Sequence, residues 1–357
     1  MKTGIKGAFL SILLFVMIFA VACGSGDDSM TDMELFEEAV RANLDRTSYS
    51  YEGEVSLRIE DLQLEDPDAA MMFGMFQQLG MTMKGAMDQR DPEDLRFHLD
   101  GQLNAMGMGI AMEIYVADNL MVLRAPMMTQ FFQDPRLMNG YVIMDLDQME
   151  EDPHEMQMGA AFNEDDVLAL FNYFGEITLS IMEEDFIENR GEQTVSIDGV
   201  DTKATELVIT IGEEEFERIW RAIPEVLQDE ELRGLLGNLL DEEHQGEMER
   251  ELDEFLEMVD DEAMEEALEA IKEVVDFENS EIRFTLFIDD EYRIIMEKGE
   301  FTLAVRDGGE SAVIHFGMTM SYWNINQDVD IQLPELTEEN SIHLEELIES
   351  MFQFPGL

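Results

Sequence analysis

Apolar and polar residues alternate between Tyr49 and Glu60, and this period of two predicts a long β-strand. The odd positions carry apolar or small residues: Tyr49, Tyr51, Gly53, Val55, Leu57 and Ile59. The even positions carry polar or charged residues: Ser50, Glu52, Glu54, Ser56, Arg58 and Glu60. A strand with one apolar and one solvated face is typical of antiparallel sheets.

Shorter runs with the same alternation predict many more strands. Turn residues separate these runs, and Asp198-Gly199 is a strong hairpin signal. Short links between neighbouring strands favour an antiparallel meander. The predicted strands cover residues 80–90, 94–103, 106–117, 119–125, 140–146, 183–197, 201–211, 280–289, 291–306 and 310–324, with a last edge strand at 328–333.

Other segments have the period of a helix. Thr31 and Glu34 match the capping box that begins many helices. From 247 to 275, apolar residues form a continuous stripe between glutamates and aspartates. An acidic helix repels itself, so we expect this stripe to dock on one face of the sheet. The predicted helices cover residues 31–46, 164–174, 213–275 and 341–352.

The order of these elements predicts the fold class. Helix, strands, helices and strands follow one another, which is typical of α+β proteins with one large antiparallel sheet. Residues 61–79 are apolar but irregular, so we expect a loop or short helix there. The acidic segment 145–157 contains Pro153 and predicts a loop.

The first 23 residues have the pattern of an export signal. Lys2 and Lys6 precede an apolar run from Phe9 to Ala22, and Cys23 follows directly. Small residues at 20–22 fit the cleavage site of a secretory signal. The run of 14 residues is shorter than the roughly 20 that a membrane-spanning helix needs.

Cys23 is the single cysteine in the chain, and its position after Ala20-Val21-Ala22 resembles the lipobox of bacterial lipoproteins. The resemblance implies cleavage before Cys23 and acylation of its sulfur. Two or three acyl chains would hold the protein on the extracytoplasmic face of the cell membrane. We therefore predict a signal peptide at 1–22, a lipidated cysteine and flexible tether at 23–30, and a single α+β domain at 31–357 with a helical insert at about 213–275.

The composition is extremely acidic, with 82 Asp and Glu against 21 Lys and Arg and a net charge of −61. Such a surface repels nucleic acid and anionic lipid headgroups, so we expect neither to bind the folded part. The acids are spread along the whole chain, which favours adaptation to high salt. Binding of cations or of a basic partner is the alternative.

Several short segments together resemble the LolA/LolB/LppX-like superfamily of bacterial lipoproteins. They are the lipobox, residues 46–51 after the first helix, Glu113-Ile114-Tyr115-Val116, Arg124-Ala125-Pro126, Ile197-Asp198-Gly199-Val200, Leu286-Phe287-Ile288-Asp289, Asn324 and Ile331-Gln332-Leu333-Pro334. The resemblance implies a large curved antiparallel sheet, a half-barrel, with helices packed on its concave face. It also implies an apolar space that carries lipids or acyl chains, although the long acidic insert could fill that space.

The sequence lacks the signature of an enzyme, and we expect no catalytic residues and no cofactor. The histidines lie in unrelated contexts, and no zinc, nucleophile-elbow or phosphate-loop motif is present. Met-x-Met pairs at 81/83, 106/108, 156/158 and 318/320 could bind Cu(I), but apolar strand faces need the same spacing. Acids at 145–152 could bind calcium, yet their spacing is not that of a known loop, so a solvated loop is favoured.

Two functions are consistent with these features. The first is an anchored lipoprotein that binds or carries a hydrophobic ligand such as a lipid. The 29 methionines favour it, because methionine adapts to irregular apolar surfaces. The second is a structural or interaction lipoprotein without a small-molecule ligand, its protein partner unidentified. For the first function, the predicted lining residues are Tyr49, Tyr51, Val55, Met106, Met108 and Met112.

Overall fold

The structure is a computed structural model of the whole chain. It describes residues 30–64, 78–91, 94–105, 107–124, 135–138, 140–146, 181–238, 261–307 and 309–352, together with single positions between these ranges. The predicted signal peptide, Cys23, the helix at 164–174 and most of the segments 61–79 and 145–157 lie outside the described residues.

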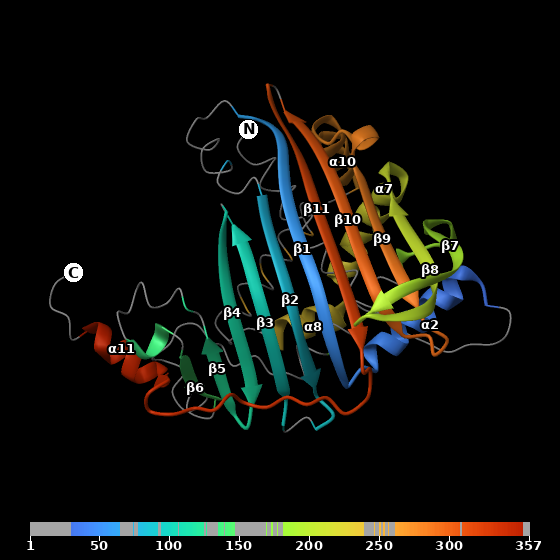
Figure 1. Ribbon diagram of the computed structural model, residues 1–357. Coiled ribbons are helices and arrows are strands. Elements are labelled where there is room, and N and C mark those ends of the chain that lie inside the picture. The colour runs from blue at the N-terminus through green and yellow to red at the C-terminus, as the bar shows by residue number, and fades with distance from the viewer. Residues whose placement is uncertain are drawn as a thin grey trace. The chain divides into compact units, whose positions relative to one another are not determined.

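The strands form one open sheet in the order β12-β6-β5-β4-β3-β2-β1-β11-β10-β9-β8-β7 (Figure 1). The pairs from β1/β2 through β5/β6 and from β7/β8 through β9/β10 are antiparallel, whereas the short pair β12/β6 is parallel. The α+β class and the large, mostly antiparallel sheet with helices are therefore confirmed. The strands are β1 (Ser48–Gln63), β2 (Gln78–Asp88), β3 (Arg96–Ala105), β4 (Met108–Ala117), β5 (Leu120–Arg124), β6 (Tyr141–Asp145), β7 (Ile187–Ile197), β8 (Val200–Ile211), β9 (Glu281–Ile288), β10 (Ile294–Asp307), β11 (Glu310–Trp323) and β12 (Ser341–His343).

Two hairpins show how local sequence sets the strand connections. Asp198 and Gly199 have φ values of 48° and 77°, and they join β7 to β8. Asp118 and Asn119, with φ values of 52° and 58°, join β4 to β5 in the same way. Positive φ at both central residues matches the twist of the flanking strands, and Asp, Asn and Gly tolerate it best. The hairpin predicted at Asp198-Gly199 is confirmed.

The chain divides into two compact units, and β1 and β11 contribute residues to both. The first unit contains residues 1–45, 59–71 and 156–316, and the second contains 46–58, 72–155 and 317–357. The prediction of a single domain from residue 31 stays a prediction.

In the first unit, α2 (Asp32–Leu44) packs its apolar side against the sheet. The predicted capping box is present: Glu34 donates its N–H to the Thr31 hydroxyl, and Thr31 donates its N–H to the Glu34 carboxylate. Phe36, Ala39 and Val40 of α2 are buried in a core with residues of β8, β9 and β10. The helix therefore covers the apolar face of these strands.

The predicted helical insert contains three described helices in this unit: α7 (Glu213–Gln228), α8 (Glu230–Asn238) and α10 (Asp261–Val274). Trp220 of α7 donates its indole N–H to the Met264 carbonyl of α10 at 3.3 Å. Lys272 of α10 forms ion pairs with Glu217 and Glu213 of α7. The two helices therefore contact each other through this hydrogen bond and through these ion pairs.

In the second unit, β1 to β6 form the antiparallel meander that the alternation predicts. The short helix η2 (Pro135–Met138), β6, β12 and α11 (Leu344–Phe352) share a small core. Ile342 and Leu347 are the most deeply buried residues of this core, at 1% and 0% exposure.

Two predicted boundaries are wrong. Residues 328–333 are not a strand, although the segment has a suitable alternation. None of the described strands pairs with this segment, so it lacks the ladder hydrogen bonds of a sheet. The closing helix begins at Leu344 and not at Ser341, because residues 341–343 pair with Tyr141, Val142 and Ile143 as β12.

Candidate functional site

The strands β1 to β4 of the second unit have one continuous apolar face. Residues that pair directly in an antiparallel sheet present their side chains on the same face, so the register identifies the members of each face. We call this set the apolar face. Its members are Tyr49, Tyr51, Gly53, Val55 and Leu57 of β1, Leu79, Met81, Met83, Gly85 and Met87 of β2, Phe97, Leu99, Gly101, Leu103 and Ala105 of β3, and Met108, Ile110, Met112, Ile114 and Val116 of β4.

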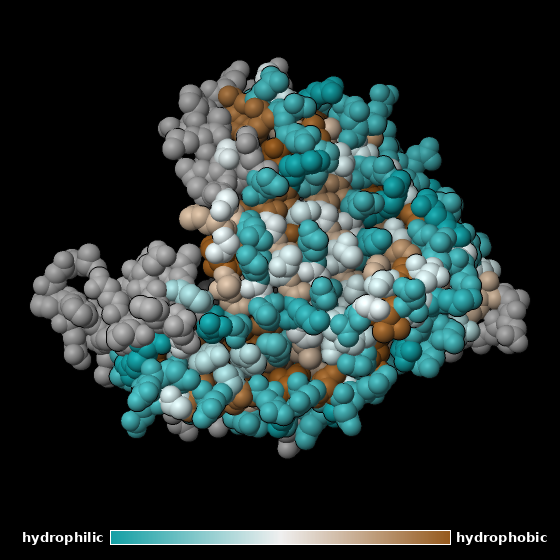
Figure 2. All heavy atoms as spheres, viewed as in Figure 1, coloured by the Kyte–Doolittle hydropathy of each residue, from teal (hydrophilic) through white to brown (hydrophobic). Residues whose placement is uncertain are grey.

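The opposite face of the same strands is polar. In one row, Glu52 pairs with Lys84, Lys84 with Asp100, and Asp100 with Glu113. Figure 2 shows mostly hydrophilic and neutral side chains over β1 to β4 on the side in view. The two faces therefore differ in polarity along the whole length of the strands.

Most large side chains of the apolar face are half-buried, and this distinguishes it from a closed core. The examples are Val55, Met83, Leu103 and Ile110, which are each partly exposed to solvent. In the first unit, by contrast, Leu207, Ile209 and other sheet residues under the helices are at most a few per cent exposed. Apolar surface is thus left accessible on β1 to β4.

Three glycines lie in the middle of the apolar face. Gly53, Gly85 and Gly101 lie on three adjacent strands, and side chains from neighbouring positions lie over them. The Met320 side chain of β11 lies over Gly53, and Met112 lies over Gly101, with its Cγ 3.5 Å from the position of a Cβ there. Because methionine is unbranched and flexible, the side chains of Met320 and Met112 can move without a change in the backbone.

Tyrosines occupy one end of the apolar face. The Tyr49 ring lies edge-on to Tyr322 at 5.7 Å between centroids, and the Arg46 guanidinium lies 4.3 Å from the Tyr322 centroid. Tyr51 donates its hydroxyl hydrogen to the His98 carbonyl at 3.2 Å. Burial raises the pKa of Tyr51 well above its ordinary value, so this hydroxyl stays protonated. The tyrosines therefore place packed aromatic rings and polar hydroxyl groups at one end of an otherwise apolar surface.

The structure brings the described members of the predicted lining together on this face. Tyr49, Tyr51, Val55 and Met112 lie on it, and Met108 lies at its edge with 59% exposure. Met106 lies outside the described residues. That these residues line a ligand site stays a prediction.

Sequence reasoning named Met83 and Met320 only as members of Met-x-Met pairs and did not place them beside Gly53, and it missed Gly101. Their positions follow from the register between strands, because Gly53 pairs with Met83 and Met83 pairs with Gly101. Alternation within one strand identifies a face but not which residues of other strands lie beside it.

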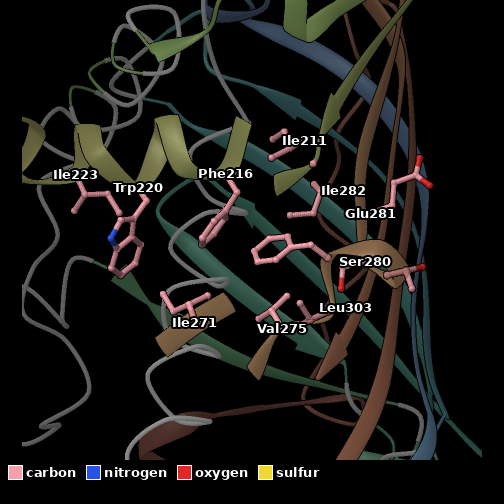
Figure 3. A pocket seen from close by; sticks show the side chains of 13 residues that line it. Ile211, Phe216, Trp220, Ile223, Ile271, Val275, Ser280, Glu281, Ile282 and Leu303 are labelled. Atoms are coloured by element: carbon pink, nitrogen blue, oxygen red, sulfur yellow. The ribbon is translucent and has the colours of Figure 1, made fainter. Parts of the chain in front are cut away.

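The first unit contains a separate small cavity between α7, α10 and the ends of β8, β9 and β10. Figure 3 shows Phe216 and Trp220 of α7 directed toward Ile271 and Val275, on the α10 side of the cavity. The Phe216 ring also packs against Phe277 at 5.4 Å between centroids. The lining is almost wholly apolar, so the cavity can hold only an apolar group.

The volume of this cavity is about 70 Å³. Pockets for small molecules usually measure about 300–1,000 Å³. The cavity is therefore too small for a complete lipid and fits a short apolar group at most.

The described residues contain no cluster of three or more His, Cys, Asp or Glu that could hold a metal ion. His98 stacks on Tyr115 at 4.4 Å between centroids, on the polar face. Burial lowers the pKa of His98 and raises that of Tyr115 to about 12, so both side chains are neutral at pH 7. Of the acids considered for calcium, Asp145 ends β6 and those at 147–152 lie outside the described residues.

No helix among the described residues is long and apolar enough to cross a membrane. No family model matches the chain, and no curated protein matches it. Among solved structures, LprF from Mycobacterium bovis aligns with 87% of this chain and 100% of its own, at 9% identity and a TM-score of 0.31. A DUF1329 family protein from Desulfovibrio piger aligns with 84% of this chain and 93% of its own, at 10% identity and a TM-score of 0.17.

These alignments are too weak to carry an argument about function. The open, mostly antiparallel sheet with helices against it agrees with the α+β architecture expected from the sequence.

Proposed function

We propose that this protein is an exported, lipid-anchored binding protein whose apolar face holds a hydrophobic ligand, such as the acyl chains of a lipid. The observation that carries the proposal is the apolar face of β1 to β4, which is continuous in register and only half-buried. A continuous apolar surface that stays partly accessible to solvent can mark an interaction site.

The energetics favour a ligand without a strong polar headgroup contact. Each 100 Å² of apolar surface that a ligand covers is worth about 2.5 kcal/mol. The apolar face offers thioethers and aliphatic groups, and its charged residues lie on the other side of the strands. Methionines over Gly53 and Gly101 can adapt to chains of different shape.

The anchor follows from the sequence alone. Lys2, Lys6 and the apolar run before Cys23 support export and acylation at the outer face of the cell membrane. An acyl-binding face on a membrane-bound protein would lie within reach of its ligands. We propose a binding protein and not an enzyme, because none of the described groups forms a catalytic arrangement.

A structural or interaction lipoprotein without a ligand is the second candidate. The small volume of the cavity beside α7 and α10 favours it, because this cavity cannot enclose a lipid. The acidic outer sides of those helices would then meet a cell-wall component or a protein partner.

A matched pair of variants tests the first candidate. Ile110 and Ala111 are neighbours in β4, with Ile110 on the apolar face and Ala111 on the polar face. Binding of a fluorescent fatty acid to the chain from Gly24 onward should weaken at least tenfold in Ile110→Asn and stay unchanged in Ala111→Asn. Equal binding by both variants, or no binding by the parent chain, would refute an acyl-binding role for this face.

A further inference from the structure

Two Met-x-Met pairs lie on the strands that flank β1. Met83 of β2 pairs with Gly53, and Met81 pairs with Val55 two residues further along β1. On the other side of β1, β11 is the neighbouring strand, and Met320 lies over Gly53 with its Cε 3.0 Å from the position of a Cβ there. Met318 shares that face, because residues two apart in a strand do.

Gly53 therefore lies between two methionine positions on the flanking strands, and the Met320 side chain lies over it. Adjacent strands are about 4.8 Å apart, so the backbones of Met83 and Met320 are separated by roughly 10 Å. Two unbranched side chains that lean toward each other can span this gap with one ion between their sulfur atoms. A side chain at position 53 would collide with the Met320 sulfur, and glycine leaves room for that sulfur to lie on the Met83 side of β11.

The chemistry of this position suits a soft metal ion. Thioether sulfur prefers Cu(I), whereas carboxylates, carbonyls and water suit Mg²⁺ and Ca²⁺. Packing alone does not require sulfur at all four positions, because leucine has a similar volume and replaces methionine at little cost. The net charge of −61 also raises the concentration of cations near the protein.

We propose that a single Cu(I) ion binds over Gly53, with Met83 and Met320 as ligands and Met81 or Met318 completing the coordination. This site lies on the apolar face but goes beyond the proposed acyl binding, since it requires the sulfur atoms and not only the apolar character of the face.

A silver titration tests the site. Ag(I), a soft monovalent ion that does not change oxidation state here, is added to the native protein extracted in detergent, with any free Cys23 thiol alkylated beforehand. Methionine methyl groups labelled with ¹³C report each residue separately. We expect saturation at one equivalent, with the methyl signals of Met83 and Met320 shifted most.

Leucine variants separate ligation from packing. Met83→Leu and Met320→Leu should each weaken Ag(I) binding at least about tenfold, since loss of even an outer-shell partner costs that much at metal sites. Met108→Leu is the control, because Met108 lies on the same face at its exposed edge. Absence of saturable binding, or an equal loss in Met108→Leu, would overturn the proposal.

Discussion

Two glycines of the apolar face have different surroundings, so replacing each with alanine should change the stability of the protein differently. Gly85 of β2 and Gly101 of β3 are both buried, and neither has a positive φ. A Cβ at Gly85 would collide with the main-chain carbonyl of His98 and lie 2.7 Å from the Tyr51 hydroxyl oxygen. At Gly101 its nearest neighbour is Met112 Cγ at 3.5 Å, an ordinary contact.

The expected magnitudes follow from these contacts. Overpacking against a main chain that cannot move costs about 1–3 kcal/mol. Displacement of Tyr51 from the His98 carbonyl adds about 1 kcal/mol for the lost hydrogen bond. Gly85→Ala should therefore destabilise the protein by about 2–4 kcal/mol. Gly101→Ala should be neutral or stabilise it by about 0.4–1 kcal/mol, because alanine restricts the unfolded chain.

Urea unfolding followed by circular dichroism measures both effects. With a slope of about 2 kcal/mol per molar urea, the midpoint for Gly85→Ala should fall by about 1–2 M. The midpoint for Gly101→Ala should stay the same or rise slightly. Equal midpoints for the two variants would refute the register and the packing described for this face.

Three further predictions concern the anchor, the charge and the helix pair. Cys23→Ser should move the protein out of the membrane fraction or leave its signal uncleaved, and a cleaved variant that stays membrane-bound would contradict acylation. Because a net charge of −61 repels itself, the melting temperature should rise between dilute buffer and molar NaCl; an unchanged value would contradict this, and an equal rise with millimolar calcium alone would indicate specific cation binding. A hydrogen bond from Lys272 lowers the pKa of Glu217 below the ordinary glutamate value of 4.5. The pair therefore contributes its full stabilisation above pH 4.5, and this stabilisation is lost as the pH falls through the lowered pKa. Lys272→Gln should then lower the stability at pH 7 and have a smaller effect below pH 4, measured by urea unfolding, and a pH-independent difference would contradict the ion pair.

Local patterns in the sequence were sufficient for most of the fold. The alternation from Tyr49, the capping box at Thr31 and Glu34, and the turn at Asp198-Gly199 each act within a few residues, and each is present in the structure. Such signals do not depend on the rest of the chain, so they can be interpreted without it.

The errors arise where distant partners decide the outcome. Ser341 begins a strand and not a helix because β6 lies beside it, about 200 residues earlier in the sequence. Residues 328–333 alternate like a strand but have none beside them. In the candidate site, the positions of Met83 and Met320 on either side of Gly53 depend on the pairing of strands that no local pattern encodes.

The central claim is that the apolar face holds a hydrophobic ligand, and the contents of the protein purified from its host membranes test it most directly. Solvent extraction releases a bound lipid but would leave the covalently attached acyl chains that we predict at Cys23 in place. We predict about one extractable lipid per protein by mass spectrometry, lost in Ile110→Asn and kept in Ala111→Asn. Recovery of no apolar molecule from the parent protein, or of the same amount from Ile110→Asn, would contradict the claim.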